Sequence, residues 1–359
     1  MTPRADARPE VAPGEAAARV AVVGAGAWGT TLAVLVGNVE PVVLLARDTA
    51  AARRIDTARE NVRRLPGIAL PSAVHVTADP AALDDAPDLV IFATPSAHLR
   101  ESVERVAPHV APSADLLSVV KGLEPGSLMR MTEVIAAAGG FGRRRLAALS
   151  GPNLADEIAR GLPASGVVAA EDPELADRVV ARIGRREFRL YVNSDVLGVE
   201  LCGALKNVLA IAAGAADGLG FGDNGKAGLM TRGLAEMTRL GVAAGANPLT
   251  FAGLAGIGDL IATCGSTLSR NHRLGPELAK GRTWAEIEAA LPGVAEGAYT
   301  VDAALALASR HGVEMPIAQE VHNALFEGKS VQRCLIDLLA RESKDELADA
   351  GAWAARLQG

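Results

Sequence analysis

Short apolar runs alternate with longer stretches of helical periodicity through the first half of the chain. Each run has four to six residues, most of them aliphatic, as is typical of strands buried on both faces. Regular alternation with helices predicts a mostly parallel sheet covered on both sides, with a ligand crevice at the carboxyl ends of the strands. The predicted strands are residues 19–23, 41–46, 74–77, 88–93, 115–120, 146–150, 165–169 and 187–192.

From about residue 195 the strand pattern stops and helical periodicity dominates. The most apolar predicted helix covers residues 195–216 and is hydrophobic on almost every face, so it should lie buried in a bundle. Lys206 places a charged side chain in the middle of this apolar helix, and Asn207 follows it. Because burial favours the uncharged form of an amine, this lysine is a candidate for proton transfer. The alternative is a lysine at the helix edge whose amine reaches solvent.

A glycine-rich turn follows the first predicted strand and opens a helix that extends to about residue 36. Gly24, Gly26 and Gly29 have the G-x-G-x-x-G spacing of a dinucleotide-binding turn. The first glycine permits a tight turn, the second lets a pyrophosphate approach, and the third lets helix and strand pack closely. Amide groups at the start of the helix, from about Ala27, would hold the phosphates. The context predicts a doubly wound, Rossmann-type α/β fold.

The second predicted strand ends in Arg47 and Asp48, where such folds contact the ribose of the cofactor. An arginine there can contact the 2′-phosphate of NADP(H), whereas an acidic residue binds the 2′-hydroxyl of NAD(H). Arg47 therefore predicts that NADP(H) is accepted, and Asp48 keeps NAD(H) as an alternative. A solvated arginine after a strand is the other interpretation.

The patterns divide the chain into three parts. Residues 1–18, rich in proline, alanine and charge, predict a disordered tail. Residues 19–194 form the predicted dinucleotide-binding domain, and residues 195–359 a predicted all-helical domain. The fold class expected is therefore α/β, a doubly wound sheet followed by an all-α domain.

Composition limits the class of function. Hydrophobic residues make up 49% of the chain, which is ample for sizeable cores. The net charge of −6 argues against a broad nucleic-acid surface but allows a local site for a small anion. Cys202, Cys264 and Cys334 share no metal-ligand spacing and predict free thiols in a reducing compartment. With no signal peptide and no credible membrane span, we expect a soluble, cytoplasmic protein that needs no metal.

Polar residues at the ends of predicted strands are candidates for the crevice. They are the segment 95–96, Lys121, and the segment 150–153 with the sequence Ser-Gly-Pro-Asn. Because the carboxyl ends of parallel strands meet at one edge of a sheet, these residues should lie close together. An ordinary surface loop is the alternative for Lys121.

The second half adds candidates in segments predicted as loops. A glycine-rich loop is predicted at 218–226, before a helix at 227–244. Arg270 and Asn271 lie in a polar segment where the fork of donors of arginine and the amide of asparagine suit a phosphate. Asp259 is a further candidate, although it could merely cap the helix that follows it.

Short motifs follow one another from about residue 19 to about residue 329: G-x-G-x-x-G-T, K-G-L, S-G-P, K-N-V, T-R-G-L-A-E-M, G-D-L, S-R-N and V-E-M-P. In this order they resemble those of bacterial NAD(P)-dependent sn-glycerol-3-phosphate dehydrogenases. The resemblance implies a dinucleotide domain, an all-helical substrate domain and an active site between them. It also implies that NADP(H) or NAD(H) serves to interconvert dihydroxyacetone phosphate and sn-glycerol 3-phosphate for phospholipid synthesis.

The resemblance assigns roles to individual residues. Lys206 matches the proton acceptor, and Lys121 matches a lysine that touches both cofactor and substrate. The positions matching cofactor contacts are Gly24, Gly26, Ala27, Trp28, Gly29, Arg47, Lys121, Ala155, Arg270, Val294 and Glu296. The positions matching substrate contacts are Lys121, Gly151, Asn153, Lys206, Asn207, Asp259, Ser269, Arg270 and Asn271.

Two residues depart from the family pattern. Asn153 stands where the family usually has Ser or Thr, and Leu154 stands where it usually has Phe. Asn153 can still donate a hydrogen bond to a substrate. The departures leave a non-catalytic NAD(P)-binding paralogue as one alternative function.

A second alternative is a β-hydroxyacid or 6-phosphogluconate type dehydrogenase with a similar two-domain plan. Those enzymes place an asparagine one helical turn after the catalytic lysine, whereas Asn207 adjoins Lys206. The partner expected in every case is a small molecule, with no nucleic acid and no membrane span. A homodimer is a further candidate.

Overall fold

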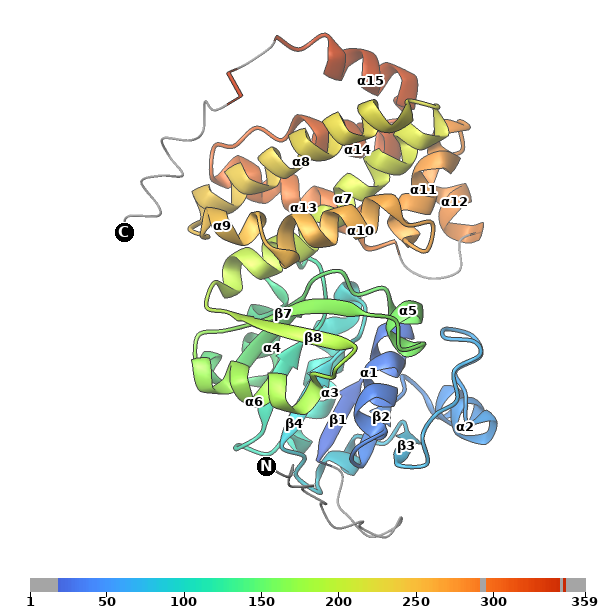
Figure 1. Ribbon diagram of the computed structural model, residues 1–359, viewed down its shortest axis with the longest axis vertical. Coiled ribbons are helices and arrows are strands. Elements are labelled where there is room, and N and C mark those ends of the chain that lie inside the picture. The colour runs from blue at the N-terminus through green and yellow to red at the C-terminus, as the bar shows by residue number, and fades with distance from the viewer. Residues whose placement is uncertain (1–18, 291–294, 343–344, 347–359) are drawn as a thin grey trace, which may run out of the picture.

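The chain folds into a sheet flanked by helices and a helical bundle stacked on it, as the computed structural model in Figure 1 shows. The structure describes residues 19–290, 295–342 and 345–346. The predicted tail at 1–18 lies outside the described residues.

All the predicted strands are present and join one sheet. Their order across the sheet is β3-β2-β1-β4-β5-β6-β7-β8, with the crossover between β3 and β4 that a doubly wound sheet requires. The strands are β1 (Val20–Val23), β2 (Val42–Leu45), β3 (Val74–Thr77), β4 (Leu89–Phe92), β5 (Asp115–Ser118), β6 (Leu146–Ser150), β7 (Ala164–Ala170) and β8 (Phe188–Asn193).

The last two strands run opposite to the rest. β7 pairs with β6 in antiparallel fashion, and β8 pairs with β7 in parallel. The connection between β6 and β7 holds only the short helix α5 (Ala155–Ala159), and antiparallel pairing needs no full crossover helix. The sheet is therefore mostly parallel, as predicted, with a reversed edge.

Helices cover both faces of the sheet. Alternate residues of β1 enter opposite cores: Val20 and Val22 pack on one side, Ala21 and Val23 on the other. This alternation explains why the strand is continuously apolar. The helices of the first core are α1 (Ala27–Gly37), α2 (Thr49–Ala58) and α6 (Pro173–Ile183), and those of the second are α3 (Leu99–Val106) and α4 (Met131–Gly139).

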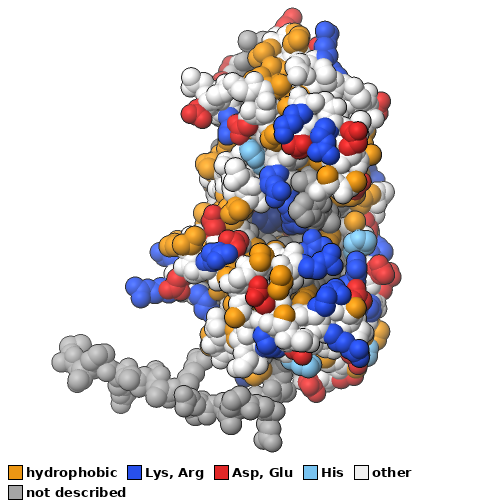
Figure 2. All heavy atoms as spheres, turned by 90° about the vertical axis from the view of Figure 1, so that its right-hand side faces the viewer, with side chains coloured by type: hydrophobic (Ala, Val, Ile, Leu, Met, Phe, Trp, Pro, Cys, Tyr) orange, Lys and Arg blue, Asp and Glu red, His pale blue; other side chains and the backbone are white. Residues whose placement is uncertain are grey.

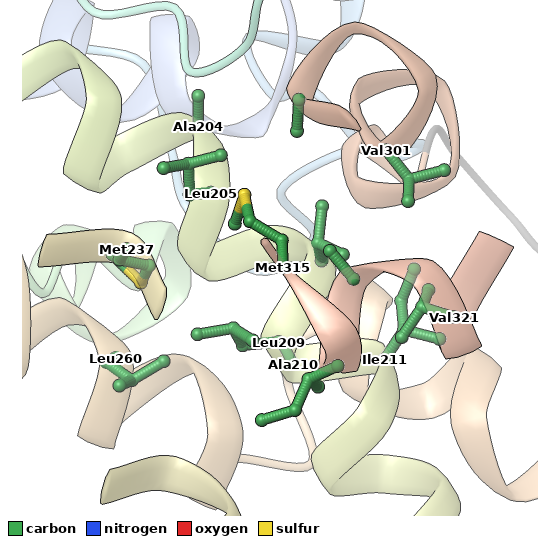
Figure 3. Packing of buried hydrophobic residues seen from close by; sticks show 14 of the residues in the cluster. Ala204, Leu205, Leu209, Ala210, Ile211, Met237, Leu260, Val301, Met315 and Val321 are labelled. Carbon is green, nitrogen blue, oxygen red and sulfur yellow. The ribbon is translucent and has the colours of Figure 1, made fainter. Parts of the chain in front are cut away.

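The predicted buried helix is α7 (Val196–Gly218), the centre of the bundle. Figure 3 shows Leu205, Leu209 and Ile211 of this helix enclosed by side chains of its neighbours. Two helical stretches, Val196–Gly218 and Pro248–Gly265, are long and apolar enough to cross a membrane, but 83% and 50% of their tested windows are buried in the protein. The surrounding helices include α8 (Gly222–Ala244), α10 (Asp259–Gly265), α11 (Arg270–Ala279), α13 (Glu296–Arg310) and α14 (Pro316–Phe326).

Two segments predicted as loops are helical. Most of the predicted loop at 218–226 belongs to α7 or α8, which starts at Gly222. Lys226 of α8 forms an ion pair of 2.6 Å with Asp217 of α7 across the turn between the helices. The segment with Arg270 starts α11, capped by the hydroxyl of Ser269, which accepts a hydrogen bond of 3.2 Å from the His272 amide. Both loop predictions were wrong.

Candidate active site

The glycine-rich turn between β1 and α1 forms an open cradle of backbone. Gly24 has a φ of +116°, and a Cβ there would lie 2.8 Å from the carbonyl of Ala93. A Cβ on Gly29 would lie 2.0 Å from the Gly24 oxygen, whereas Gly26 is open. Among the described residues no side chain caps α1, so its first amides, from Ala27, are available to an anion. The cradle therefore fits the pyrophosphate of a dinucleotide.

Trp28 and Ala155, two further predicted cofactor contacts, border this cradle. The Trp28 ring packs edge-on against Phe188 at 6.0 Å, and its buried indole N–H has no partner in the described structure. The carbonyl of Ala155 accepts a hydrogen bond of 3.0 Å from the Thr31 hydroxyl, which ties α5 to α1. Both residues lie near the glycine-rich turn, and their contact with a cofactor stays a prediction.

Arg47 stands at the end of β2 with 91% of its side chain exposed. Its neighbour Asp48 caps α2 by accepting a hydrogen bond of 2.7 Å from the Ala51 amide, a bond that lowers the pKa of Asp48. Arg47 lies 3.3 Å from the other oxygen of the same carboxylate. Because the Asp48 carboxylate caps α2, the exposed guanidinium of Arg47 is the more available group for a ribose phosphate.

Two lysines from opposite halves meet on one buried carboxylate. Lys121, directly after β5, lies 2.7 Å from one oxygen of Asp259, and Lys206 of α7 lies 2.7 Å from the other. The side chain of Lys206 is only 7% exposed, so the interpretation as a solvated helix edge is wrong. Asp259 does not cap α10 either, because Gly258 is the N-cap.

The charges of this cluster favour an anionic ligand. Burial lowers the pKa of Lys121 to about 8, with repulsion from Lys206 adding to the effect and attraction to Asp259 opposing it. Burial alone would raise the pKa of Asp259, but the two ammonium groups hold it below its usual range. With both lysines protonated, the cluster carries a net positive charge that an anion can neutralise.

Thr263 is a site residue that sequence reasoning missed. Its hydroxyl accepts a hydrogen bond from the Lys206 amine and donates one of 3.2 Å to Asp259. Thr263 follows Asp259 by one turn of α10, so both project toward the same amine. That spacing was the only signal available in the sequence, and it is common to many helices.

Asn207 and Asn271 join three helices beside the lysines. The Asn271 amide donates a hydrogen bond of 2.8 Å to the Asn207 side chain, and its oxygen accepts one of 2.9 Å from the Gly297 amide. Arg270, on the first turn of α11, is exposed and forms no hydrogen bond or ion pair with its side chain in the described parts of the chain. Its guanidinium is thus available to a ligand.

The loop after β6 contains a further buried polar side chain, Asn153, without a hydrogen-bond partner among the described residues. The Gly151 carbonyl accepts a hydrogen bond of 2.9 Å from the Lys121 amine, which places the loop against the cluster. Both polar atoms of the Asn153 amide are buried without a partner in the described structure. Since buried amides are normally hydrogen-bonded, Asn153 marks a place where a ligand would supply the missing groups.

Glu296, at the start of α13, links the two halves a second time. Its carboxylate accepts hydrogen bonds from the hydroxyl and the amide of Ser96, which follows β4 as the strand-end argument predicted. Burial raises the pKa of Glu296, and the bonds to Ser96 oppose that rise. Val294, the other predicted contact of this segment, lies outside the described residues.

Two family models together match most of the chain. The one described as NAD-dependent glycerol-3-phosphate dehydrogenase N-terminus matches residues 19–176. The one described as NAD-dependent glycerol-3-phosphate dehydrogenase C-terminus matches residues 195–336.

Individual proteins match over almost their full length. Glycerol-3-phosphate dehydrogenase (NAD(P)+) of Streptomyces coelicolor is 46% identical over 329 residues, which are 91% of this chain and 98% of the relative. The protein of that name from Parafrankia sp. is 49% identical over 330 residues, with 91% and 98% covered. The crystal structure of glycerol-3-phosphate dehydrogenase from Coxiella burnetii has 36% identity and a TM-score of 0.86, and the match covers 90% of this chain and 99% of that one.

Proposed function

The chain belongs to the NAD-dependent glycerol-3-phosphate dehydrogenase family, and on this premise we propose that Lys206 transfers the proton while Lys121 and Arg270 hold the substrate. The activity is that of an NAD(P)-dependent oxidoreductase that interconverts dihydroxyacetone phosphate and sn-glycerol 3-phosphate for phospholipid synthesis. The observation that carries the assignment of roles is the buried lysine–carboxylate–lysine cluster. Family membership argues against a β-hydroxyacid dehydrogenase, and the intact cluster supports turnover rather than a paralogue without it.

The sheet half would hold the cofactor, which when bound supplies or takes up the hydride at carbon 2 of the substrate. The open glycine cradle supports a pyrophosphate on the first amides of α1. Arg47, exposed at the end of β2, would contact a 2′-phosphate, and this role stays a prediction. The remaining proposed cofactor contacts are Trp28, Lys121, Ala155, Arg270 and Glu296.

The helical half would hold the phosphate of the substrate. The available guanidinium of Arg270 is a strong phosphate ligand, and it lies on the first turn of α11 where the helix dipole adds to the attraction. Asn271 and Ser269 lie beside it on the same turn. From the sheet half, the Gly151 loop would place the unpaired amide of Asn153 against the substrate.

Hydrogen-bond counting supports the role of Lys206. A protonated amine has three donors, and Asp259 and Thr263 take two of them. The third can donate to the oxygen on carbon 2 as the ketone is reduced, and the neutral amine can take that proton back in the oxidation. Lys121 likewise donates to Asp259 and Gly151 and keeps one donor that can polarise the same oxygen.

Four further predictions, on the domain boundary, the partner, the location and the oligomeric state, stay proposals. We place the domain boundary near residue 194, since β8 ends at Asn193 and α7 begins at Val196. The similarity to dehydrogenases supports a small-molecule partner and suggests a cytoplasmic location. The homodimer is a prediction that the mass of the protein in solution would test.

The phosphate requirement tests the proposed function. We expect NAD(P)H to be oxidised with dihydroxyacetone phosphate, and at least about 10²-fold more slowly with unphosphorylated dihydroxyacetone. The reason is that contacts with Arg270 hold carbon 2 in place, so their loss lowers kcat/KM. The measurement is kcat/KM for both ketones with NADPH and with NADH. Equal values for the two ketones would contradict the clamp.

A second test concerns the space beside Lys121. Gly203 lies one turn before Lys206, and a Cβ there would lie 3.3 Å from Cγ of Lys121 and 2.8 Å from the Ser150 hydroxyl. We expect Gly203→Ala to lower kcat/KM about tenfold or more by displacing Lys121, an overpacking effect of roughly 1–3 kcal/mol. The better helix propensity of alanine, about 1 kcal/mol, should limit the loss of stability.

Gly228→Ala is the matched control. Gly228 lies inside α8, and a Cβ there meets nothing within 4 Å. This variant should gain stability and keep its kcat/KM. If Gly203→Ala retains wild-type kcat/KM, Lys121 does not depend on the close approach of α7.

A further inference from the structure

Glu200 of α7 is 7% exposed and holds the start of α4, a helix of the sheet half. One oxygen of its carboxylate accepts a hydrogen bond of 2.8 Å from the Thr132 amide. The other oxygen accepts one of 2.6 Å from the Thr132 hydroxyl and one of 2.5 Å from the Arg130 guanidinium. Because the first amides of a helix lack partners within the helix, a carboxylate is favoured there. Glu200 therefore joins the central helix of the bundle to the sheet half.

Burial makes this carboxylate costly to the folded protein. Removal from water raises the pKa of Glu200, and the charge of Arg130 and the hydrogen bonds from Thr132 oppose that rise. The Arg130 side chain is itself only 15% exposed. A buried ion pair often adds little net stability, because the lost solvation of both charges offsets their attraction. The position of the pair at the joint between the two halves indicates a role beyond stability.

The segment that leads from Lys121 to Arg130 folds back on itself. Leu123 and Arg130 form an antiparallel bridge, and the Glu124 amide donates a hydrogen bond of 2.9 Å to the Met129 carbonyl. Leu123 is 1% exposed and belongs to the same buried apolar cluster as the side chains of α7. Since Lys121 lies two residues before this bridge, the position of Arg130 constrains the position of Lys121.

Glu200 and Gly203 lie one turn apart on the same side of α7. A Cβ on Gly203 would lie 3.3 Å from Cγ of Lys121, so α7 and this lysine approach closely. Lys206 follows one turn later, and both amines end on Asp259. Figure 2 shows a hollow between the two halves, bordered on this side of the molecule by Lys and Arg side chains. At such a boundary, the relative position of the two lysines depends on the contacts that cross it.

We propose that Glu200 is a positioning residue for the reaction, which holds residues 121–130 against α7 so that Lys121 and Lys206 reach the same oxygen of the substrate. This inference rests on the proposed function, because it takes both lysines as the groups that act on that oxygen. Glu200 acts through Arg130 and the bridge to Leu123.

Glu200→Gln in the full chain tests this role. Glutamine keeps the shape of the side chain, but one oxygen becomes an N–H donor that faces the Thr132 amide or the Arg130 guanidinium, which are donors too. We expect kcat with dihydroxyacetone phosphate to fall about tenfold or more, since small displacements of reacting groups are costly. The KM for NADPH should stay within about twofold, because the glycine cradle is a separate part of the sheet half. A merely structural role would lower the midpoint of unfolding and leave kcat of the folded protein unchanged.

Thr132→Val decides the question if Glu200→Gln does not fold. Valine has nearly the shape of threonine and removes only the hydroxyl bond to Glu200, so the bonds from the amide and from Arg130 stay. We expect kcat to fall about threefold or more, as for the loss of one hydrogen bond, with the KM for NADPH again unchanged.

Glu236→Gln is the matched control. Glu236 of α8 is 2% exposed and accepts hydrogen bonds from the Ile317 amide at 2.8 Å and the Ala318 amide at 3.4 Å. It is thus a buried carboxylate at the start of a helix, α14, but both of its helices belong to the helical half. We expect Glu236→Gln to lower the midpoint of thermal unfolding, as Glu200→Gln does, and to keep kcat within about twofold.

The proposal is overturned if Glu200→Gln, or Thr132→Val in its place, keeps the kcat of wild type. It is also overturned if Glu236→Gln loses kcat to the same extent, because general destabilisation would then explain both losses. Failure of the proposed function is seen separately, as wild-type protein that does not reduce dihydroxyacetone phosphate with NADPH.

Discussion

Lys206→Ala is expected to lower turnover about 10²–10⁴-fold, which is the typical contribution of a positioned acid–base group. The amine is buried, and Asp259 and Thr263 hold it in place, so a methyl group at this position leaves no proton donor of similar placement. The fold should tolerate the change, because Asp259 keeps its ion pair with Lys121. The Kd of NADPH should change little, since the glycine cradle belongs to the other half of the chain.

Single-turnover rates with saturating NADPH and dihydroxyacetone phosphate would measure this loss. Lys206→Arg should not restore the rate, because a guanidinium keeps its proton near neutral pH. Lys280→Ala is the control, since this lysine of the helical half is 65% exposed and, in the part of the chain that the structure describes, pairs with nearby Glu277 alone. More than about a tenth of wild-type turnover in Lys206→Ala would assign the proton transfer to another group.

Features that depend on neighbouring residues could be predicted from the sequence. The strands and the glycine cradle follow from apolar runs and glycine spacing, and α7 follows from its lack of a polar face. The position of Lys121 followed from the rule that the ends of parallel strands meet at one edge. The meeting of Lys206 with Asp259 followed from no local pattern, because 53 residues separate them.

The wrong predictions arose where distant contacts override local preference. Pro276 lies inside α11, where a proline is normally unfavourable, and the carbonyl of His272, one turn earlier, packs against Gly214 of α7. A Cβ on Gly214 would lie 2.0 Å from that carbonyl oxygen, so the glycine permits the approach that stabilises α11. The reversed direction of β7 likewise depends on the path of a connection, which residue patterns do not encode.

Asp259→Asn is expected to cost about 3–5 kcal/mol of stability at pH 7, as when one partner of a buried ion pair is removed. The carboxylate is 1% exposed and is the acidic group that pairs with both Lys121 and Lys206. Asparagine keeps the shape of the side chain but leaves two amines facing each other without a counter-charge. Turnover should also fall, on the order of 10²-fold, since the amine of Lys206 loses one of the two groups that position it.

The pH dependence of the free energy of unfolding identifies why Asp259→Asn is less stable. In the folded protein the pKa of Lys121 is about 8, below its value in an unfolded chain, so the unfolded state binds more protons and stability rises with pH above about 8. Without the Asp259 carboxylate, protonation of Lys121 is even less favourable in the folded protein. The loss of stability in Asp259→Asn should therefore be largest at low pH, where Lys121 is protonated. The difference in the free energy of unfolding between wild type and Asp259→Asn should shrink as the pH rises through about 8, because Lys121 is then neutral in both folded proteins.

Urea unfolding of both proteins at several pH values between about 7 and 9.5 would measure this trend, with m-values compared to confirm a common unfolded state. Asp56→Asn serves as the control, because Asp56 is 51% exposed and pairs with Arg59 at the surface of α2. It should change the free energy of unfolding by less than about 0.5 kcal/mol at every pH. A deficit in Asp259→Asn that stays constant with pH would mean that lost packing, rather than uncompensated charge on Lys121, destabilises the variant.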